Sequence, residues 1–259
     1  MSRIEDATPS RRDLVRDFYA HRVHSPRRRE MSAGVQHVWY GSFGSNLCSE
    51  RFRCYLRGGK VEGMSVEQPG ARDPTVPFSV PPTKSCPTTS IVVPHRVFFA
   101  KVSPWWSNGG VAFLDVAAEE TDERFHSTLR CWRITLDQFN DVFAQENGIH
   151  PRDEAAEKVR FSREEVIELA RTKSGSHRIQ DGAWYGYVRA LGFAEADELE
   201  PILTFTLPPH ELEAIRTGIV DEVNPPSPGY HDVIARGLCE LGLERETADE
   251  YLRARYTLM

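Results

Sequence analysis

The chain has 259 residues, of which 40% are hydrophobic and 10% aromatic, and its formal net charge is −6. This length suits one large domain or two small ones with a sizeable core. The mildly acidic balance argues against nucleic acid as a partner. No apolar run approaches the ~20 residues that span a bilayer, and the N-terminus lacks a secretory signal. We therefore expect a cytoplasmic protein without a membrane partner.

Residues 1–36 are rich in Arg, Ser and Asp, a composition that predicts a partly ordered N-terminal extension. The five cysteines along the chain form no CxxC pair, and the nine histidines form no HExxH motif. We therefore expect reduced thiols and no metal site.

Residues 38–47 begin as an apolar, aromatic run and then break into small polar residues, GSFGSN at 41–46. This pattern predicts a buried strand and a tight loop, and the spacing of apolar residues over 48–56 predicts a helix. Strand, tight loop and helix together form the geometry of an anion or oxyanion cradle. An ordinary strand-to-helix turn has the same pattern, because short Gly-rich turns are common.

Residues 57–90 are rich in Gly, Pro, Ser and Thr, which predicts a long loop that borders a site or lies over it.

Strands are then predicted at 90–94, 96–100 and 111–116 from their β-branched and aromatic content. The paired glycines at 109 and 110 follow two tryptophans. They would either admit a ligand or form a hairpin turn over a Trp-rich part of the core.

A strand at 127–134 precedes a predicted helix at 136–148, with Thr135 as its N-cap. At about 100° per residue, Glu146 lies at the edge of the buried stripe of this helix. A half-buried carboxyl with a raised pKa would suit a general acid/base. The alternative is a solvated glutamate in the last turn of a helix.

The rest of the chain mixes strands and helices. Helices are predicted at 162–171, 209–215, 230–241 and 245–256, and strands at 183–193 and 201–207. Because strands outnumber helices in the middle of the chain, the pattern indicates an α+β fold with a mixed, barrel-like sheet.

Four stretches occur in a fixed order: 39–47 (WYGSFGSNL), 109–112 (GGVA), 133–146 (RITLDQFNDVFAQE) and 225–230 (PPSPGY). Together they resemble the γ-glutamylcyclotransferase-like family. The resemblance implies a small mixed-sheet β-barrel flanked by helices over residues 37–259. It further implies loop insertions near 57–90, 147–180 and 208–223. Phe43 stands where the family usually has tyrosine.

In this family the α-amino group of a γ-glutamyl amine or peptide attacks its own γ-carbonyl, which releases 5-oxoproline. The resemblance implies Glu146 as the general acid/base and requires no metal or organic cofactor. It implies substrate-binding roles for Phe43, Gly44, Ser45, Asn46, Leu47, Gly109 and Gly110.

Two alternatives remain open at this point. The same cavity and Glu146 could activate water, which would make the protein an amide hydrolase or deacylase. The fold could also serve a non-catalytic protein that binds a small molecule. The sequence carries no signal for an oligomeric state.

Overall fold

A computed structural model describes residues 37–75, 90–179, 182–194 and 200–256, so the predicted extension at 1–36 lies outside it. The described residues all belong to one compact unit. The strands of the described part are β1 (His37–Ser42), β2 (Ser90–Val93), β3 (Val97–Ser103), β4 (Gly109–Leu114), β5 (Ser127–Thr135), β6 (Gly175–His177), β7 (Tyr187–Phe193) and β8 (Pro201–Thr206). The helices are η1 (Ser45–Leu47), α2 (Ser49–Arg57), η2 (Pro104–Trp106), η3 (Glu123–Phe125), α3 (Leu136–Glu146), α4 (Glu154–Lys158), α5 (Arg163–Thr172), α6 (Pro209–Arg216), α7 (Pro228–Glu240) and α8 (Arg245–Arg253).

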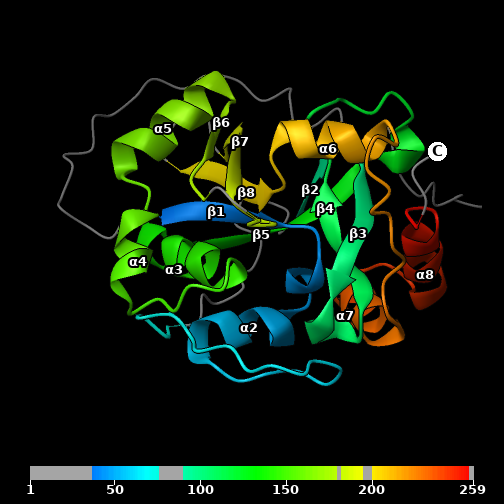
Figure 1. Cartoon of the computed structure of the whole chain (residues 1–259), viewed down its shortest axis with the longest axis horizontal. Helices are drawn as coiled ribbons and strands as arrows, with labels where there is room; N and C mark the ends of the chain where they lie inside the picture. The colour runs from blue at the N-terminus through cyan, green and yellow to red at the C-terminus, as the bar shows by residue number, and fades with distance from the viewer. Residues whose placement is uncertain (1–36, 76–89, 180–181, 195–199, 257–259) are drawn as a thin grey trace, which may run out of the picture. The chain divides into compact units, whose positions relative to one another are not determined.

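One sheet of six strands has the order β2-β5-β1-β8-β7-β6, and β3 pairs with β4 in a separate hairpin (Figure 1). Strand β1 lies in the middle of the larger sheet, antiparallel to β5 and parallel to β8. Tyr40 of β1 stands opposite Trp132 on one side and Leu203 on the other. The predicted α+β class with a mixed sheet flanked by helices is therefore confirmed.

The described residues do not close this sheet into the predicted barrel, because β2 and β6 remain as edges. Among the described residues, β4 meets the end of β8 through the Thr206 side chain and not through a backbone ladder. The Thr206 hydroxyl accepts from the Leu114 amide at 3.1 Å and donates to the Leu114 carbonyl at 3.0 Å. Two tyrosine hydroxyls form hydrogen bonds with the backbone of Ala112 in the same way. The Tyr230 hydroxyl accepts from the Ala112 amide at 3.2 Å, and the Tyr185 hydroxyl donates to the Ala112 carbonyl at 2.9 Å. These hydroxyls therefore form hydrogen bonds with the backbone amides and carbonyls of β4 that another strand would need in order to close the sheet into a barrel.

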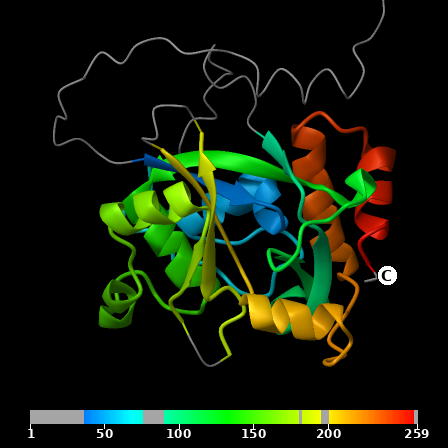
Figure 2. The same ribbon diagram turned by 90° about the horizontal axis from the view of Figure 1, so that it is seen from above.

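Two hydrophobic clusters fill the unit. The first packs α7 and α8 against the β3–β4 hairpin, with Phe98, Phe113 and Ile234 among its buried members. The second packs α2, α3 and α5 against the larger sheet, with Phe139 and Leu203 in its centre. Figures 1 and 2 both show α7 and α8 beside the hairpin and α5 at the opposite end. In the described ranges, no helix combines the length and the apolar character needed to cross a bilayer.

The capping residues account for where the middle helices begin. Thr135 and Gln138 form a reciprocal capping box at the start of α3, and Ser162 and Glu165 form another at the start of α5. The described part of the 57–90 loop is fastened to α3, because Arg72 forms an ion pair with the buried Asp141 at 2.9 Å. The stretches predicted as insertions carry structure of their own: α4, α5 and β6 in 147–180, and α6 in 208–223.

Helix α7 lies unusually close to the segment that follows β1. A Cβ atom added to Gly237 would lie 2.4 Å from the Leu47 carbonyl carbon and 2.5 Å from the Cys48 amide nitrogen. Only glycine permits this approach of two backbones, since real side-chain atoms need ~3.5–4.0 Å. Gly237 therefore sets how closely α7 supports η1.

Candidate active site

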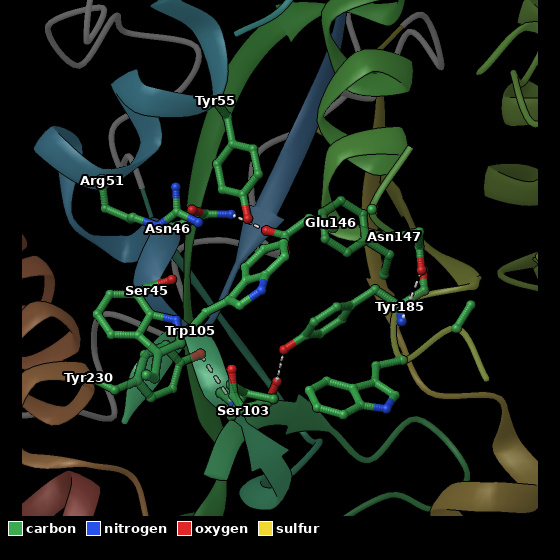
Figure 3. A pocket seen from close by; sticks show the side chains of 18 of the residues that line it. Ser45, Asn46, Arg51, Tyr55, Ser103, Trp105, Glu146, Asn147, Tyr185 and Tyr230 are labelled. Atoms are coloured by element: carbon green, nitrogen blue, oxygen red, sulfur yellow. Dashed lines mark hydrogen bonds between the residues drawn. The ribbon is translucent and has the colours of Figure 1, made fainter. Parts of the chain in front are cut away.

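A cavity of about 290 Å³ opens where the two hydrophobic clusters meet. Its walls come from both clusters and from the segments between them, with Glu146 at the end of α3 on one side (Figure 3). Aromatic members of the two clusters line it: Phe43, Trp106 and Tyr230 from the first, and Tyr40, Tyr55 and Phe205 from the second. Its position at the junction gives a largely apolar cavity into which a few polar groups project.

The tight loop after β1 forms one wall, where Phe43, Gly44, Ser45 and Asn46 all line the cavity. The Asn46 carbonyl is held in place by the Trp132 indole at 2.9 Å and by the Ser42 hydroxyl at 3.0 Å. The first amides of a helix have no acceptor within the helix, so η1 starts with N–H groups of this kind. The loop therefore places backbone N–H groups beside the cavity, and the Ser45 amide among them faces the Tyr230 hydroxyl.

Glu146 meets this loop directly. The Asn46 side-chain amide donates to the Glu146 carboxylate at 2.8 Å and to the Tyr40 hydroxyl at 3.1 Å. Figure 3 shows Asn46, Tyr55 and Glu146 converging at this point. Two stretches 100 residues apart in the sequence thus share one hydrogen bond.

Burial raises the pKa of Glu146, while the Arg51 charge and hydrogen bonds from Tyr55 and Asn46 act in the opposite direction. Glu146 remains partly exposed at the cavity that it lines. Burial also raises the pKa of Tyr230 to about 12, and that of Tyr55 well above its usual value. Around neutral pH the tyrosine hydroxyls are therefore neutral, and Glu146 is the carboxyl positioned to exchange a proton.

Three residues predicted to bind substrate lie outside the cavity lining: Leu47, Gly109 and Gly110. Leu47 is fully buried, and its amide already donates to the Gly44 carbonyl at 2.9 Å. A Cβ on Gly110 would lie 1.8 Å from the Asn224 carbonyl oxygen, and one on Gly109 would lie 2.2 Å from the Ser227 amide nitrogen. The paired glycines therefore admit the 224–227 backbone of the chain itself.

The structure adds cavity residues that sequence reasoning did not select. They include Arg51, Tyr55, Ser103, Trp105, Tyr185 and Tyr230. A sequence signal existed for two of them, because Arg51 and Tyr55 are four residues apart on α2 and therefore share a face. In the described ranges, no three His, Cys, Asp or Glu side chains gather so that they could hold a metal ion.

Comparisons with known proteins give three results. No family model matches the chain. Histone deacetylase 5 of Arabidopsis thaliana is 36% identical over 217 residues, which make up 83% of this chain but only 30% of that protein. A solved structure of a gamma-glutamyl cyclotransferase is similar over 83% of this chain and 86% of its own, with a TM-score of 0.45 and 14% identity. The chain thus spans less than a third of the length of its curated relative.

Proposed function

We propose that this chain is a γ-glutamylcyclotransferase-type enzyme that releases 5-oxoproline from a γ-glutamyl amine or peptide. The observation that carries the proposal is the 2.8 Å hydrogen bond between Asn46 and Glu146 at the wall of the cavity. It joins a backbone cradle to a carboxyl whose pKa is raised by burial. Acyl transfer needs these two components, a group that polarises a carbonyl and a group that moves a proton.

The reaction begins when the α-amino nitrogen of the substrate attacks its own γ-carbonyl carbon. A carbon–nitrogen bond forms, Glu146 accepts the proton that leaves the amine, and the carbonyl oxygen becomes an oxyanion. The amides of the 44–46 segment stabilise this oxyanion. When the original amide bond breaks, Glu146 returns a proton to the departing nitrogen. The products are 5-oxoproline and a free amine, and no water is consumed.

The proposed reaction is intramolecular, because both reacting groups belong to one substrate molecule. The protein then needs only to hold the substrate folded, with amine and carbonyl in contact. The partly exposed indoles of Trp105 and Trp184 also line the cavity. They suit a leaving amine that carries an apolar or aromatic group.

The test is the substitution Glu146→Gln, assayed for 5-oxoproline with a panel of γ-glutamyl amines. Glutamine keeps the shape and can still accept the Asn46 hydrogen bond, but it cannot take a proton. We expect kcat to fall by about 10²- to 10⁴-fold, the usual contribution of a general acid/base. Asp137→Asn is the matched control, because it removes a carboxylate from the same helix at a side chain that is 80% exposed.

Two results would overturn the proposal. Undiminished release of 5-oxoproline by Glu146→Gln would exclude Glu146 as the proton carrier. Release of free glutamate instead of 5-oxoproline by the wild type would identify an amide hydrolase that uses the same cavity.

A further inference from the structure

Tryptophan side chains form part of the cavity wall, and packing in the core does not account for all of them. Trp106 is 3% exposed, and its ring centroid lies 4.8 Å from that of Tyr230, so Trp106 is a core residue. Trp105 and Trp184 line the same cavity but remain partly exposed. Figure 3 shows the Trp105 side chain pointing into the cavity. Large aromatic side chains left open to a pocket are typical of a site that binds an apolar group.

The backbone around Trp105 is held in one conformation. The Ser65 amide donates to the Trp105 carbonyl at 3.3 Å, and the Asn108 amide donates to the Ser103 carbonyl at 2.8 Å, which closes the loop after β3. Ser107 and Asn108 have φ values of 53° and 61°, in the left-handed region. Residues other than glycine adopt this region only where their surroundings require it. The loop therefore presents the Trp105 indole to the cavity at a fixed position.

Trp184 is joined to the end of α3 through its neighbour Tyr185. The side-chain oxygen of Asn147 accepts from the Tyr185 amide at 3.3 Å, and its side-chain nitrogen donates to the Tyr185 carbonyl at 3.2 Å. The same nitrogen donates to the Phe143 carbonyl of α3 at 2.9 Å. Asn147 directly follows Glu146, which returns a proton to the leaving nitrogen in the proposed reaction. The Trp184 segment is therefore fastened to the part of α3 that serves the leaving amine.

The cavity offers little positive charge to a ligand. Among the described residues that line it, only Arg51 and Glu146 are charged. Arg51 is 2% exposed, and its Nε and Nη1 atoms are buried without a partner in the described part of the chain, so these atoms do not reach a ligand. The amides after β1 serve the γ-glutamyl end of the substrate. A second carboxylate, on the leaving amine, would lose its water and meet indoles instead of a cation.

We propose that Trp105 and Trp184 form a subsite for the leaving amine, and that this subsite selects an aromatic amine without a carboxylate. The aromatic ring of the amine packs on the indoles in the offset or edge-on geometry that such rings favour. This inference rests on the proposed function and deepens it. It narrows the substrate class to γ-glutamyl amides of aromatic monoamines. γ-Glutamyl amino acids and peptides, whose leaving amines carry a carboxylate, are then poor substrates.

The first test compares two substrates that differ by one carboxylate. γ-Glutamylphenethylamide and γ-glutamylphenylalanine release amines with the same aromatic ring, and only the second of these amines bears a carboxylate. We expect wild-type kcat/KM to be about 100-fold higher for the first substrate, the effect of a charged group that is left without a partner. Equal values, or a preference for γ-glutamylphenylalanine, would overturn the inference, and this comparison does not depend on the folding of any variant.

The second test measures the contribution of the indoles. Wild-type kcat/KM should be about 10- to 100-fold higher for γ-glutamylphenethylamide than for γ-glutamylethylamide, the effect of burying a phenyl ring. Trp105→Leu and Trp184→Leu should each lower this ratio by about 3- to 10-fold, because leucine is apolar but has no aromatic face. Phe193→Leu replaces a partly exposed aromatic residue outside the cavity lining and should keep the wild-type ratio. An unchanged ratio in either tryptophan variant would refute the proposed subsite.

A binding measurement separates this inference from the proposed reaction. Calorimetry on Glu146→Gln with N-acetylphenethylamine and with N-acetylphenylalanine requires no turnover, and the variant lacks the negative charge that would itself repel a carboxylate. We expect N-acetylphenethylamine to bind about 10-fold more tightly or better. This preference, without 5-oxoproline from any substrate, would support the subsite and defeat the proposed reaction. Release of 5-oxoproline with equal kcat/KM from both substrates of the first test would do the reverse.

Discussion

Replacement of Gly237 by alanine tests the close contact between α7 and the loop at the cavity. The added Cβ would lie 2.4 Å from the Leu47 carbonyl carbon and 2.5 Å from the Cys48 amide nitrogen. Normal contact needs ~3.5–4.0 Å, so one backbone must move by about 1 Å. Both obstructing atoms belong to the main chain, and no side-chain rotation can relieve the overlap.

Two opposing terms set the size of the effect. Alanine favours a helix interior over glycine by about 1 kcal/mol, which would stabilise the protein. Overpacking a tight contact costs about 1–3 kcal/mol and sometimes more, and backbone obstruction belongs at the upper end. We therefore expect Gly237→Ala to lower the free energy of unfolding by about 1–2 kcal/mol. For a chain of this size, that corresponds to a melting temperature lower by roughly 2–8 °C.

The same substitution should reduce activity, because Leu47 follows Asn46 directly. A displacement of about 1 Å at a positioning group can reduce the rate by roughly 10²-fold. Stability is measured by urea denaturation followed by tryptophan fluorescence, and activity by 5-oxoproline release. Gly229→Ala on the same helix is the control, since its Cβ would meet Gly63 Cα at an ordinary 3.5 Å. If Gly237→Ala matched Gly229→Ala in both measurements, the close-contact argument would be refuted.

Two further predictions concern carboxyl groups on α3. Asp141→Asn should lower the free energy of unfolding by about 1–3 kcal/mol, because Asp141 is 1% exposed and pairs with Arg72 and Arg160, which are 36% and 18% exposed. Urea denaturation measures this, and a loss no larger than that of the exposed Asp137→Asn would contradict it. Glu146 has a pKa raised above its ordinary 4.5, so its contribution to stability is complete at low pH and is lost as pH rises through the raised value. The stability of Glu146→Gln relative to wild type should therefore increase with pH above 4.5, and parallel pH profiles of the two proteins would exclude the effect.

Local pattern predicted the parts of the site that depend on neighbours in sequence. The position of Glu146 followed from the period of one helix, and the loop at 43–46 followed from residues that break a strand. The capping boxes of α3 and α5 are also local, and the one at α5 is recognisable from the three-residue spacing of Ser162 and Glu165.

The features that depend on contacts between distant parts of the chain could not be predicted from the local sequence pattern. Gly109 and Gly110 looked like an approach for a ligand, but the backbone that they admit comes from residues 224–227, more than a hundred positions away. Arg51 reads as one charge in a charged helix, and only the packed structure reveals that its donors are unmet. The predicted closed barrel was wrong, because side-chain hydroxyls and not another strand form hydrogen bonds with the free edge of β4.

The hydroxyl groups along β4 link the lining of the cavity to the protection of a strand edge. Strand edges with free amides and carbonyls recruit other chains. In the β3–β4 hairpin, one edge is occupied by Tyr185, Tyr230 and Thr206, and the other pairs with the segment at 222–224. Both tyrosines also line the cavity. Replacing either tyrosine by a residue without a hydroxyl would also uncover part of this strand edge. The Phe43 side chain lines the same cavity and has no hydrogen-bonding group to lose, so the cavity can change there at less cost.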